Sequence, residues 1–574
     1  MFAEIDFPAA AGRLRCSFAN PVALHEARNL ADVPAAIAAA ATEAGRGRWV
    51  VGFVAYEAAP AFDAAMKVRP PRTDLPLAWF AAFAAADESN LEAAGTFDCA
   101  AWHGELDGPE FAADVERIRA DIRAGRYYQN NHSARYRAAF SGDPRAFHRA
   151  LAATQPNGYC LYLDGGAWQL LSVSPELFFD WSTDGRLATR PMKGTAPRHA
   201  SPAADGAAAS ALLASSKERA ENLMIVDLLR NDLARLAQTG TVRVPRLFEI
   251  EALPTAWQMT STVECLTRPE VALTDVFAAL FPCGSITGAP KLAAMQSIAA
   301  GEHSPRGAYC GALGIIRPGG HATFNVGIRT VTVSAGCAEA GIGSGITLDS
   351  QAAAEFAEWQ VKRRFLLRAG ADFSLLETLR LEDGAYWLRE RHLHRLAASA
   401  GHFGFVLEPG RVEAALDALA KKHAAGTWRV RLQVNRAGVP QLEAFALEAP
   451  TAPLAVALAL SPVADDERLR HKTSDRTPYA AHAPTPGRFD TLLYNVRGEL
   501  TEFTRGNLVA EIAGRRLTPP LACGLLPGVL RAELLESGAI EEAVLTRDDL
   551  ARATRLWFIN SVRGWIEVAV NAST

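Results

Sequence analysis

The chain lacks the signatures of several protein classes. Its eight cysteines are scattered without a Cys-x-x-Cys pair or another short spacing, so we expect neither a disulfide framework nor a zinc site. The formal net charge is −4 and no basic cluster stands out, which gives no electrostatic basis for binding nucleic acid. Apolar runs such as residues 78–86 are far shorter than the roughly 20 residues of a membrane-spanning helix.

A basic and apolar leader is also missing, because Met1-Phe2-Ala3 is followed by Glu4 and Asp6. We therefore expect no signal peptide and no membrane association. Together with the cysteine pattern, this predicts a cytoplasmic enzyme with reduced, mostly buried thiols. At 574 residues, 49% of them hydrophobic, the chain is long enough for two or more domains, each with its own core.

Among the features that are present, the stretch 188–198, Ala-Thr-Arg-Pro-Met-Lys-Gly-Thr-Ala-Pro-Arg, stands out. It places Lys193 between Pro191 and Gly194 on an extended segment where the backbone can approach a ligand closely. Such a lysine is a candidate nucleophile, although most lysines only solvate a surface. Four other motifs surround it: Ser-Pro-Glu-Leu-Phe-Phe (174–179), Lys-Glu-Arg-Ala-Glu-Asn (217–222), Gly-Ser-Ile-Thr-Gly-Ala-Pro-Lys (284–291) and Gly-Ser-Gly-Ile (343–346).

In this order and at these separations, the motifs closely resemble those of the chorismate-utilising enzymes: anthranilate synthase component I, isochorismate synthases and aminodeoxychorismate synthase component I. The resemblance covers about residues 48–366. In anthranilate synthases an alanine usually stands where this chain has Lys193, so the form Pro-x-Lys-Gly-Thr resembles aminodeoxychorismate synthase. The resemblance implies a large antiparallel β-sandwich with outer helices, and conversion of chorismate and ammonia into 4-amino-4-deoxychorismate.

The resemblance also implies roles for the matching residues. Lys193 would attack C2 of chorismate, and Glu176 would protonate the departing C4 hydroxyl. Glu221 and Glu358 match the ligands of Mg²⁺, a hard cation suited to carboxylates. Candidate substrate-binding residues are Gln129, Thr195, Tyr309, Arg329, Gly343, Gly345 and Lys362.

Plain alternatives stand beside these roles. An early helical glutamate such as Glu221 also favours the helix dipole, and Glu358 with Lys362 forms an ordinary i,i+4 pair. Gln129 stands where isochorismate-forming relatives carry a water-activating lysine, which favours ammonia as the incoming group. The alternative is that the Gln129 amide only hydrogen-bonds backbone groups in a turn. Where many relatives have a histidine near the ring, this chain has Gln258, so no acid–base role carries over to that position.

Periodicity predicts the local structure around these motifs. A buried strand should begin near residue 48, and helices should span 109–125, 216–237 and 351–367. In the second helix, Leu223, Val226, Leu229, Leu233 and Leu236 recur at helical spacing and are expected on the buried face. Residues 200–212, rich in alanine, serine and aspartate, are expected to form a loop that leads into this helix.

The remainder of the chain carries a second set of motifs. These are Leu-Glu-Thr-Leu-Arg (376–380), Arg-His-Leu-His-Arg-Leu (391–396), His-Lys-Thr (471–473), Arg-Gly-Glu-Leu-Thr-Glu (497–502), Gly-Leu-Leu-Pro-Gly-Val-Leu-Arg (524–531) and Asn-Ser (560–561). The set resembles fold-type IV pyridoxal phosphate enzymes: branched-chain and D-amino acid aminotransferases and 4-amino-4-deoxychorismate lyase.

This second resemblance implies an α/β domain with bound pyridoxal 5'-phosphate. Lys472 matches the lysine that binds the cofactor covalently, and Glu502 the carboxylate that keeps the pyridine nitrogen protonated. Arg395, Val529, Leu530 and Ser561 would hold the phosphate, partly through free N–H groups at a helix start. Singly, Lys472 and Arg395 could be surface cations and Glu502 a solvated strand end.

The two resemblances predict an α+β protein with a chorismate-binding domain at 1–366, a linker at 367–373 and a lyase domain at 374–574. The enzyme would combine a synthase of the transaminase class with a carbon–carbon lyase, and would make 4-aminobenzoate for folate. No Gly-x-Cys-x-Gly elbow is present, so a separate glutamine amidotransferase would supply ammonia. Two alternatives remain: an aminotransferase of another substrate, or a non-catalytic docking module.

The start of the second domain departs from its relatives. In most relatives, opening strands and a Gly-Asp-Gly sequence precede the motif that matches Leu-Glu-Thr-Leu-Arg (376–380). In this chain they are replaced by Ala-Asp-Phe-Ser-Leu at 371–375. A homodimer through this domain is one expected assembly, and the short start affects the region where such contacts would form.

Overall fold

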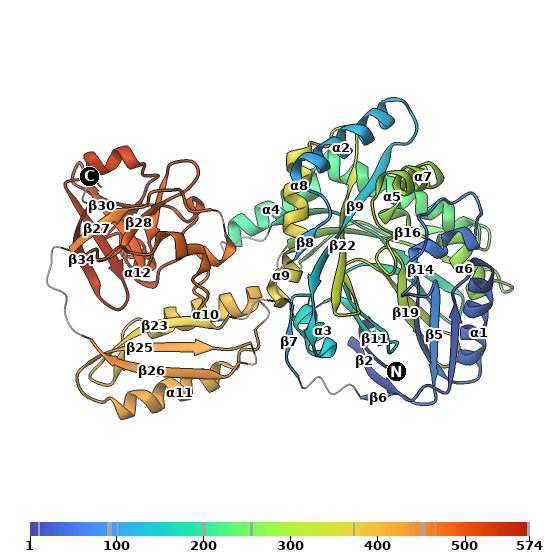
Figure 1. Ribbon diagram of the computed structural model, residues 1–574, viewed down its shortest axis with the longest axis horizontal. Coiled ribbons are helices and arrows are strands. Elements are labelled where there is room, and N and C mark those ends of the chain that lie inside the picture. The colour runs from blue at the N-terminus through green and yellow to red at the C-terminus, as the bar shows by residue number, and fades with distance from the viewer. Residues whose placement is uncertain are drawn as a thin grey trace. The chain divides into compact units, whose positions relative to one another are not determined.

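The computed structural model describes residues 1–9, 12–88, 95–99, 102–155, 157–197, 202–252, 256–370, 373–403, 405–436, 438–447, 454–464 and 466–570. The chain divides into two units, Met1–Ala371 and Asp372–Thr574 (Figure 1). Residues 367–370, expected within a linker, form the end of helix α9 (Arg364–Gly370).

The first unit is built on two ten-stranded antiparallel sheets. The first sheet has the order β18 (Gly288–Ala289), β9 (Gln129–Ala139), β22 (Cys337–Ile346), β21 (Thr330–Ser334), β12 (Trp168–Ser174), β11 (Tyr159–Asp164), β1 (Phe2–Ala9), β2 (Gly12–Ala19), β6 (Asp87–Glu88), with β8 (His103–Gly104) on β9. The second has the order β15 (Met192–Pro197), β17 (Ala256–Leu266), β14 (Arg186–Arg190), β13 (Leu177–Trp181), β20 (Ala322–Val326), β19 (Ala312–Ile316), β4 (Trp49–Val54), β5 (Ala78–Phe83), β3 (Ala23–Ala27), with β16 (Arg243–Ala252) on β17. Strands β7 (Phe97–Asp98) and β10 (Ser141–Gly142) form a separate pair.

The two sheets pack against each other as a sandwich. Phe7 and Phe18 of the first sheet share one buried cluster with Phe53 and Trp79 of the second. Separate apolar clusters join each outer face to helices, as β-sandwich geometry requires when both faces are apolar. The helices are α1 (Val33–Gly45), α2 (Gly108–Arg123), α3 (Pro144–Ala153), α4 (Pro202–Ala214), α5 (Ser216–Ala234), α6 (Leu273–Leu280), α7 (Lys291–Gly301), α8 (Ala352–Lys362) and α9, with 3₁₀ turns η1 (Leu30–Asp32), η2 (Tyr56–Ala61) and η3 (Gly284–Ile286).

Most of the predicted elements are present. The strand expected from residue 48 is β4, and the helix over 109–125 is α2, which the Asp107 side chain caps by accepting the Glu110 N–H. The helix expected at 351–367 is two helices, because α8 ends at Lys362 and α9 begins at Arg364.

Two local predictions were wrong. Residues 202–214 form helix α4 rather than a loop, since alanine is the strongest helix former; residues 198–201 lie outside the described part. Leu223 is 43% exposed, whereas Ile225 is buried with Val226, Leu229, Leu233 and Leu236. The buried face of α5 is therefore rotated slightly from the one that leucine spacing alone suggested.

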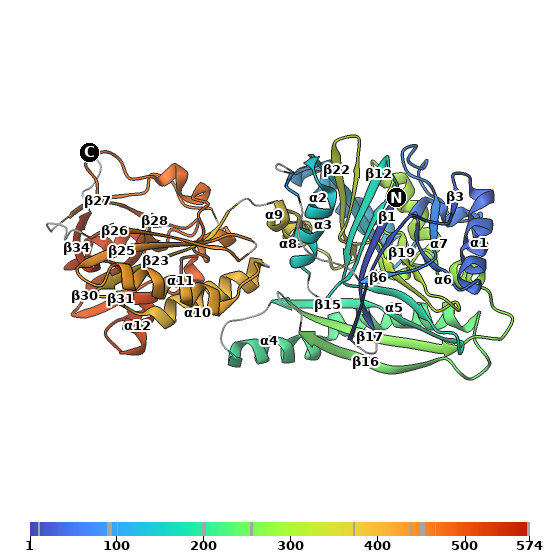
Figure 2. The same ribbon diagram turned by 90° about the horizontal axis from the view of Figure 1, so that it is seen from below.

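The second unit contains two sheets. An antiparallel sheet of β24 (Ala385–Tyr386), β23 (Leu375–Glu382), β25 (Thr427–Val434) and β26 (Pro440–Ala446) has α10 (Arg389–Phe403) and α11 (Pro409–Lys422) along one side (Figure 2). A mixed sheet has the order β29 (Leu500–Phe503), β28 (Thr491–Tyr494), β27 (Leu454–Leu458), β34 (Gly564–Val570), β33 (Arg555–Asn560), β30 (Gly506–Ile512), β31 (Arg515–Thr518), β32 (Glu541–Glu542). Because β29 also pairs with β30, the strands between them close on themselves. The other helices are α12 (Val529–Glu536) and the 3₁₀ turns η4 (Glu467–Leu469), η5 (Thr477–His482), η6 (Leu521–Cys523) and η7 (Arg547–Ala551).

The α+β class and the sandwich of the first unit are thus as predicted. All eight cysteines are free thiols and all but Cys337 are buried, which confirms the prediction that the thiols are mostly buried. Among the described residues, no helix has both the length and the apolar character needed to cross a membrane.

Candidate functional site

The candidate nucleophile lies where the edges of the two sheets of the first unit approach each other. Lys193 is on β15, Gln129 is the first residue of β9, and Gly345 is near the end of β22. A Cβ atom added to Gly345 would lie 2.8 Å from Lys193 Nζ and would overlap the Gln129 amide. Gln129 is 1% exposed and its Oε1 has no hydrogen-bond partner among the described residues. These three residues, far apart in sequence, therefore meet at one point.

The glycines of β22 make room for this group and for Tyr309. A Cβ on Gly341 would overlap the Tyr309 ring, and one on Gly343 would lie 2.9 Å from the tyrosine hydroxyl. Alternate residues of a strand share a face, so Gly341, Gly343 and Gly345 leave one continuous strip without side chains. The strip accommodates protein side chains; its close approach to substrate stays a prediction.

Glu176 lies in the short connection between β12 and β13, which belong to different sheets. Its side chain is buried, and Ser285 Oγ donates a hydrogen bond of 2.7 Å to Glu176 Oε1. Burial raises the pKa of Glu176 to about 7, although Ser285 and the nearby Lys193 ammonium favour the ionised form. A carboxyl group with this pKa is partly protonated at neutral pH, as a general acid requires.

The candidate metal ligands are Glu221 on α5 and Glu358 on α8. Burial and the charges of Glu221 and Glu358 raise the pKa of Glu218, which indicates that these carboxylates lie near one another. Lys193 Nζ is 3.7 Å from Glu221 Oε2, and Lys362 Nζ is 2.7 Å from Glu358 Oε1. Although burial acts in the opposite direction, Lys362 lowers the pKa of Glu358, so this group is ionised.

This donor set fits Mg²⁺. The ion is typically held by one or two protein carboxylates, with waters and substrate oxygens completing the shell, and Glu221 with Glu358 supply two. The described residues contain no group of three or more His, Cys, Asp or Glu side chains that could hold a metal by itself.

The remaining candidate substrate residues are arranged less uniformly. Arg329 is half-buried with φ 48°, and burial together with the neighbouring Arg368 lowers its pKa to about 10. Two guanidinium groups close together suit an anionic ligand. Lys362 Nζ also donates to the Gly343 carbonyl at 2.9 Å. Thr195 is exposed and donates to Gln258 Oε1 at 3.0 Å, so its hydroxyl is engaged across the β15–β17 pair.

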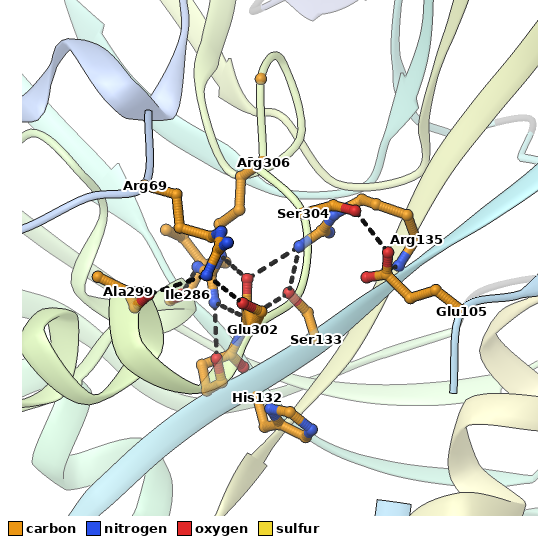
Figure 3. A network of polar contacts seen from close by, with 12 residues as sticks. Arg69, Glu105, His132, Ser133, Arg135, Ile286, Ala299, Glu302, Ser304 and Arg306 are labelled. Carbon is orange, nitrogen blue, oxygen red and sulfur yellow. Dashed lines mark hydrogen bonds and ion pairs between the residues drawn. The ribbon is translucent and has the colours of Figure 1, made fainter. Parts of the chain in front are cut away.

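A buried ionic network connects residues of β9 with the turn at Ile286 (Figure 3). Glu302 pairs with Arg135 at 2.9 Å and with Arg306 at 2.6 Å, and Ser133 Oγ donates to it at 2.7 Å. Arg306 also donates to the carbonyls of Asn131 (2.7 Å) and Ile286 (2.8 Å). The network thus ties β9, which carries Gln129, to the turn that carries Ser285.

In the second unit, the segment that contains Lys472 extends the sheet edge at β23. The Leu376 N–H donates to the Lys472 carbonyl at 2.9 Å, and Ser474 N–H donates to the Ser374 carbonyl at 2.8 Å. Burial and the nearby Arg395 lower the pKa of Lys472 to about 8. A lysine with this pKa has an appreciable neutral fraction near neutral pH, which suits a nucleophilic amine.

Glu502 of β29 is held by three donors. Tyr479 Oη donates to Oε1 at 2.9 Å, whereas the Leu526 N–H (3.2 Å) and Asn507 Nδ2 (3.4 Å) approach Oε2. Burial raises the pKa of Glu502 to about 8. A buried carboxylate of this kind fits a cationic pyridinium nitrogen, because the opposite charge would stabilise its ionised form.

The candidate phosphate residues converge on the start of α12. Arg395 Nη1 donates to the Pro527 carbonyl at 3.1 Å, just before the helix begins at Val529. Leu530 packs in one cluster with Ile559, which lies two residues before Ser561. First-turn N–H groups of a helix attract phosphate. Arg395, Val529, Leu530 and Ser561 therefore fit a phosphorylated cofactor, and Lys472 with Glu502 fits its aldehyde and ring nitrogen.

Sequence reasoning missed several supporting residues. Ser285 belongs to a motif that was noted, but its contact with Glu176 could not be inferred from a separation of 109 residues. Tyr479 lies seven residues after Lys472 and gave no separate signal. Glu377, inside the Leu-Glu-Thr motif, pairs with Arg395; its place within a motif was the available hint.

Comparisons with known proteins agree with these features. The family described as chorismate binding enzyme matches residues 84–368, and the family described as amino-transferase class IV matches residues 374–570. Anthranilate synthase component 1 of Saccharolobus solfataricus is 32% identical over 337 residues, which cover 56% of this chain and 80% of that protein. The crystal structure of anthranilate synthase component I from Streptococcus pneumoniae has a TM-score of 0.54 at 24% identity, covering 63% of this chain and 92% of that one.

Aminodeoxychorismate synthase component 1 of Salmonella typhimurium is 41% identical over 260 residues, or 45% of this chain and 57% of that protein. The chain therefore spans little more than half the length of this relative. The match covers 80% of the Saccharolobus protein, and both family models match this chain. The chain therefore belongs to the chorismate binding enzyme family, and a domain of the class IV aminotransferase family follows in the same polypeptide.

Proposed function

We propose that the first unit converts chorismate and ammonia into 4-amino-4-deoxychorismate, and that the second eliminates pyruvate from it to give 4-aminobenzoate for folate synthesis. The observation that carries the proposal is the meeting of Lys193 with Gln129 and Gly345 beside Glu221, a candidate Mg²⁺ ligand. The identity with relatives named aminodeoxychorismate synthase component 1 supports it.

In the first reaction, Lys193 Nζ would attack C2 of chorismate while the C4–O bond breaks. Glu176, with a pKa near 7, would give the departing hydroxide a proton, so that water leaves. Ammonia would then attack C4 as the C2–Nζ bond breaks, which restores the lysine. Glu221 and Glu358 would hold Mg²⁺ against one substrate carboxylate, and Arg329 would bind another anionic group.

In the second reaction, pyridoxal phosphate would supply an electron sink for the electron pair left when C4 loses its proton. Arg395, Val529, Leu530 and Ser561 would bind its phosphate, and Glu502 would keep the ring nitrogen protonated. Lys472 would hold the cofactor and, once released, would accept the C4 proton as enolpyruvate leaves. The gain of aromaticity would drive this step.

We further propose that a separate glutamine amidotransferase supplies the ammonia and that the protein acts in the cytoplasm. The designation "component 1" of relatives supports a second component. A homodimer through the second unit remains part of the proposal.

The test is product analysis of the purified chain given chorismate, Mg²⁺ and ammonium salt, with and without pyridoxal phosphate. We expect 4-aminobenzoate and pyruvate with the cofactor, and accumulated aminodeoxychorismate in Lys472→Ala. Anthranilate as the product would contradict the role of Lys193. Transamination of D-alanine or a branched-chain amino acid by the full chain, without 4-aminobenzoate, would replace the lyase by an aminotransferase.

A further inference from the structure

We propose that Glu377 is a positioning residue that holds the Arg395 guanidinium ready for the phosphate group of the cofactor. The inference rests on the proposed role of Arg395 in phosphate binding.

The contact between the two residues uses one whole edge of the guanidinium. Arg395 Nε lies 2.9 Å from Glu377 Oε1, and Arg395 Nη2 lies 2.6 Å from Glu377 Oε2. The remaining nitrogen, Nη1, donates to the Pro527 carbonyl at 3.1 Å. Since each terminal nitrogen carries two hydrogens, one N–H on Nη1 and one on Nη2 are left for an anion. The guanidinium is thus fixed between strand β23 and the loop that leads into α12.

A third group holds the carboxylate itself. His392 precedes Arg395 by three residues on α10, so both side chains reach the same side of the helix. His392 Nδ1 lies 2.6 Å from Glu377 Oε2. Glu377 and His392 are each only 1% exposed, so water does not compete for these contacts. The carboxylate therefore has little freedom to rotate away from the arginine.

The charges agree with this arrangement. Burial alone would raise the pKa of Glu377, but Arg395 and His392 lower it to about 2. The pair is therefore ionic throughout the physiological pH range. Burial lowers the pKa of His392, although the Glu377 carboxylate acts in the opposite direction. An ionised carboxylate can only accept a hydrogen bond, so His392 donates from Nδ1. Its Nε2 has no partner among the described residues, which leaves Glu377 as the contact that orients the ring.

A long arginine side chain loses conformational freedom when it binds an anion, and an arginine fixed beforehand loses less. Groups that orient a metal-binding residue commonly change metal affinity by about 10- to 100-fold when they are removed, and we expect an effect of the same order for an arginine that binds phosphate. We therefore expect Glu377 to strengthen binding of the phosphate part of the cofactor, without affecting its ring part.

The test compares two ligands that cannot bond covalently to Lys472, pyridoxine 5'-phosphate and pyridoxine. Their dissociation constants for the full chain are measured by quenching of tryptophan fluorescence. The dissociation constant of pyridoxine divided by that of pyridoxine 5'-phosphate measures the preference for the phosphorylated ligand. This ratio reports the phosphate contact alone. We expect Glu377→Ala to lower the preference for the phosphorylated ligand by about 10-fold or more, and Glu377→Asp to restore part of it.

Glu382→Gln is the matched control, because Glu382 lies on the same strand and pairs with Arg380 at 2.6 Å on the surface. It should leave the ratio unchanged. Glu377→Gln keeps the shape of the side chain and one acceptor, and it provides the test if the alanine variant fails to fold. We expect Glu377→Gln to lower the ratio less than Glu377→Ala does.

If Glu377→Ala and Glu377→Gln leave the ratio unchanged, whether or not they weaken binding of both ligands equally, the inference is overturned. Glu377 would then have a purely structural role. A different result bears on the proposed function instead. If the unaltered chain binds both ligands equally, Arg395 and the α12 start do not form a phosphate site.

Discussion

Ser285 Oγ donates a hydrogen bond of 2.7 Å to Glu176 Oε1, and both side chains are buried. The hydroxyl stabilises the ionised carboxylate, so its removal should raise the pKa of Glu176 above about 7. In Ser285→Ala we expect the fall in synthase kcat at alkaline pH to move to higher pH by roughly one pH unit. The profile is measured at constant free ammonia. Ser285→Thr, which keeps the hydroxyl, should behave like the unaltered chain, and an acid shift in Ser285→Ala would contradict the assignment.

Lys193 should form a covalent adduct with chorismate. Mass spectrometry of the intact chain, quenched with acid during turnover without ammonia, should detect the adduct. Lys193→Ala should abolish it and lower synthase kcat by about 100-fold or more, because no other amine replaces the nucleophile. Lys217→Ala is the control, since Lys217 also lies within 4.0 Å of Glu221 but its side chain is 59% exposed. An adduct that persists without Lys193 would refute this role.

Loss of either candidate metal ligand should weaken Mg²⁺ binding. Isothermal titration in the presence of chorismate should give a dissociation constant at least about 10-fold higher for Glu221→Gln and for Glu358→Gln. Asp227→Asn should have no such effect, because Asp227 lies on the same helix as Glu221 but is 58% exposed and pairs with Arg230. Unchanged affinity in both glutamine variants would place the metal elsewhere.

Attachment of pyridoxal phosphate to Lys472 should depend on pH. Burial and Arg395 lower the pKa of this lysine to about 8, and only the neutral amine attacks an aldehyde. The attachment rate, followed by absorbance after mixing, should rise as pH increases through about 8 and level off above it. The rate in Lys472→Ala should be negligible. A rise that continues toward pH 10.5, the ordinary lysine range, would show that Lys472 is not perturbed.

Glu302 should be important for stability, because it lies between two buried guanidinium groups. Glu302→Gln would leave both cations undercompensated, and we expect a loss of about 3–5 kcal/mol in the free energy of unfolding. Arg306 and Arg135 lower the pKa of Glu302 despite its burial. The stabilisation is therefore complete above the unfolded-state pKa of about 4.3 and is lost as pH falls through the lower folded-state value.

Denaturant unfolding at neutral pH measures this loss. Glu116→Gln is the control, because Glu116 pairs with Arg119 on the surface and its side chain is 56% exposed, a contact worth about 0–1 kcal/mol. A similar, small effect in both variants would mean that the buried network adds little.

Sequence reasoning predicted the two families and the α+β class from motifs, and it predicted helices over 109–125, 216–237 and 351–367 from the periodicity of their residues, which determines local structure strongly. It located α5 but placed Leu223 on the wrong side, since spacing defines a face without showing which neighbours cover it. The approach of Gln129 to Lys193 was not predictable from spacing, because it depends on where two sheet edges meet. Likewise, Glu377 and Arg395 lie 18 residues apart on a strand and a helix, and only their packing brings them together.

The pairing of residues 374–376 with residues 472–474 affects how the second unit could be produced separately. An expression boundary placed after Leu376 would remove the backbone that Lys472 and Ser474 bond to, although no catalytic side chain would be lost. Such a fragment would carry every cofactor residue yet leave its lysine on an unsupported loop. A gene fragment for this unit should therefore begin before Phe373. Residues 374–376 carry no cofactor-binding side chain, but their backbone is needed to hold the segment that contains Lys472.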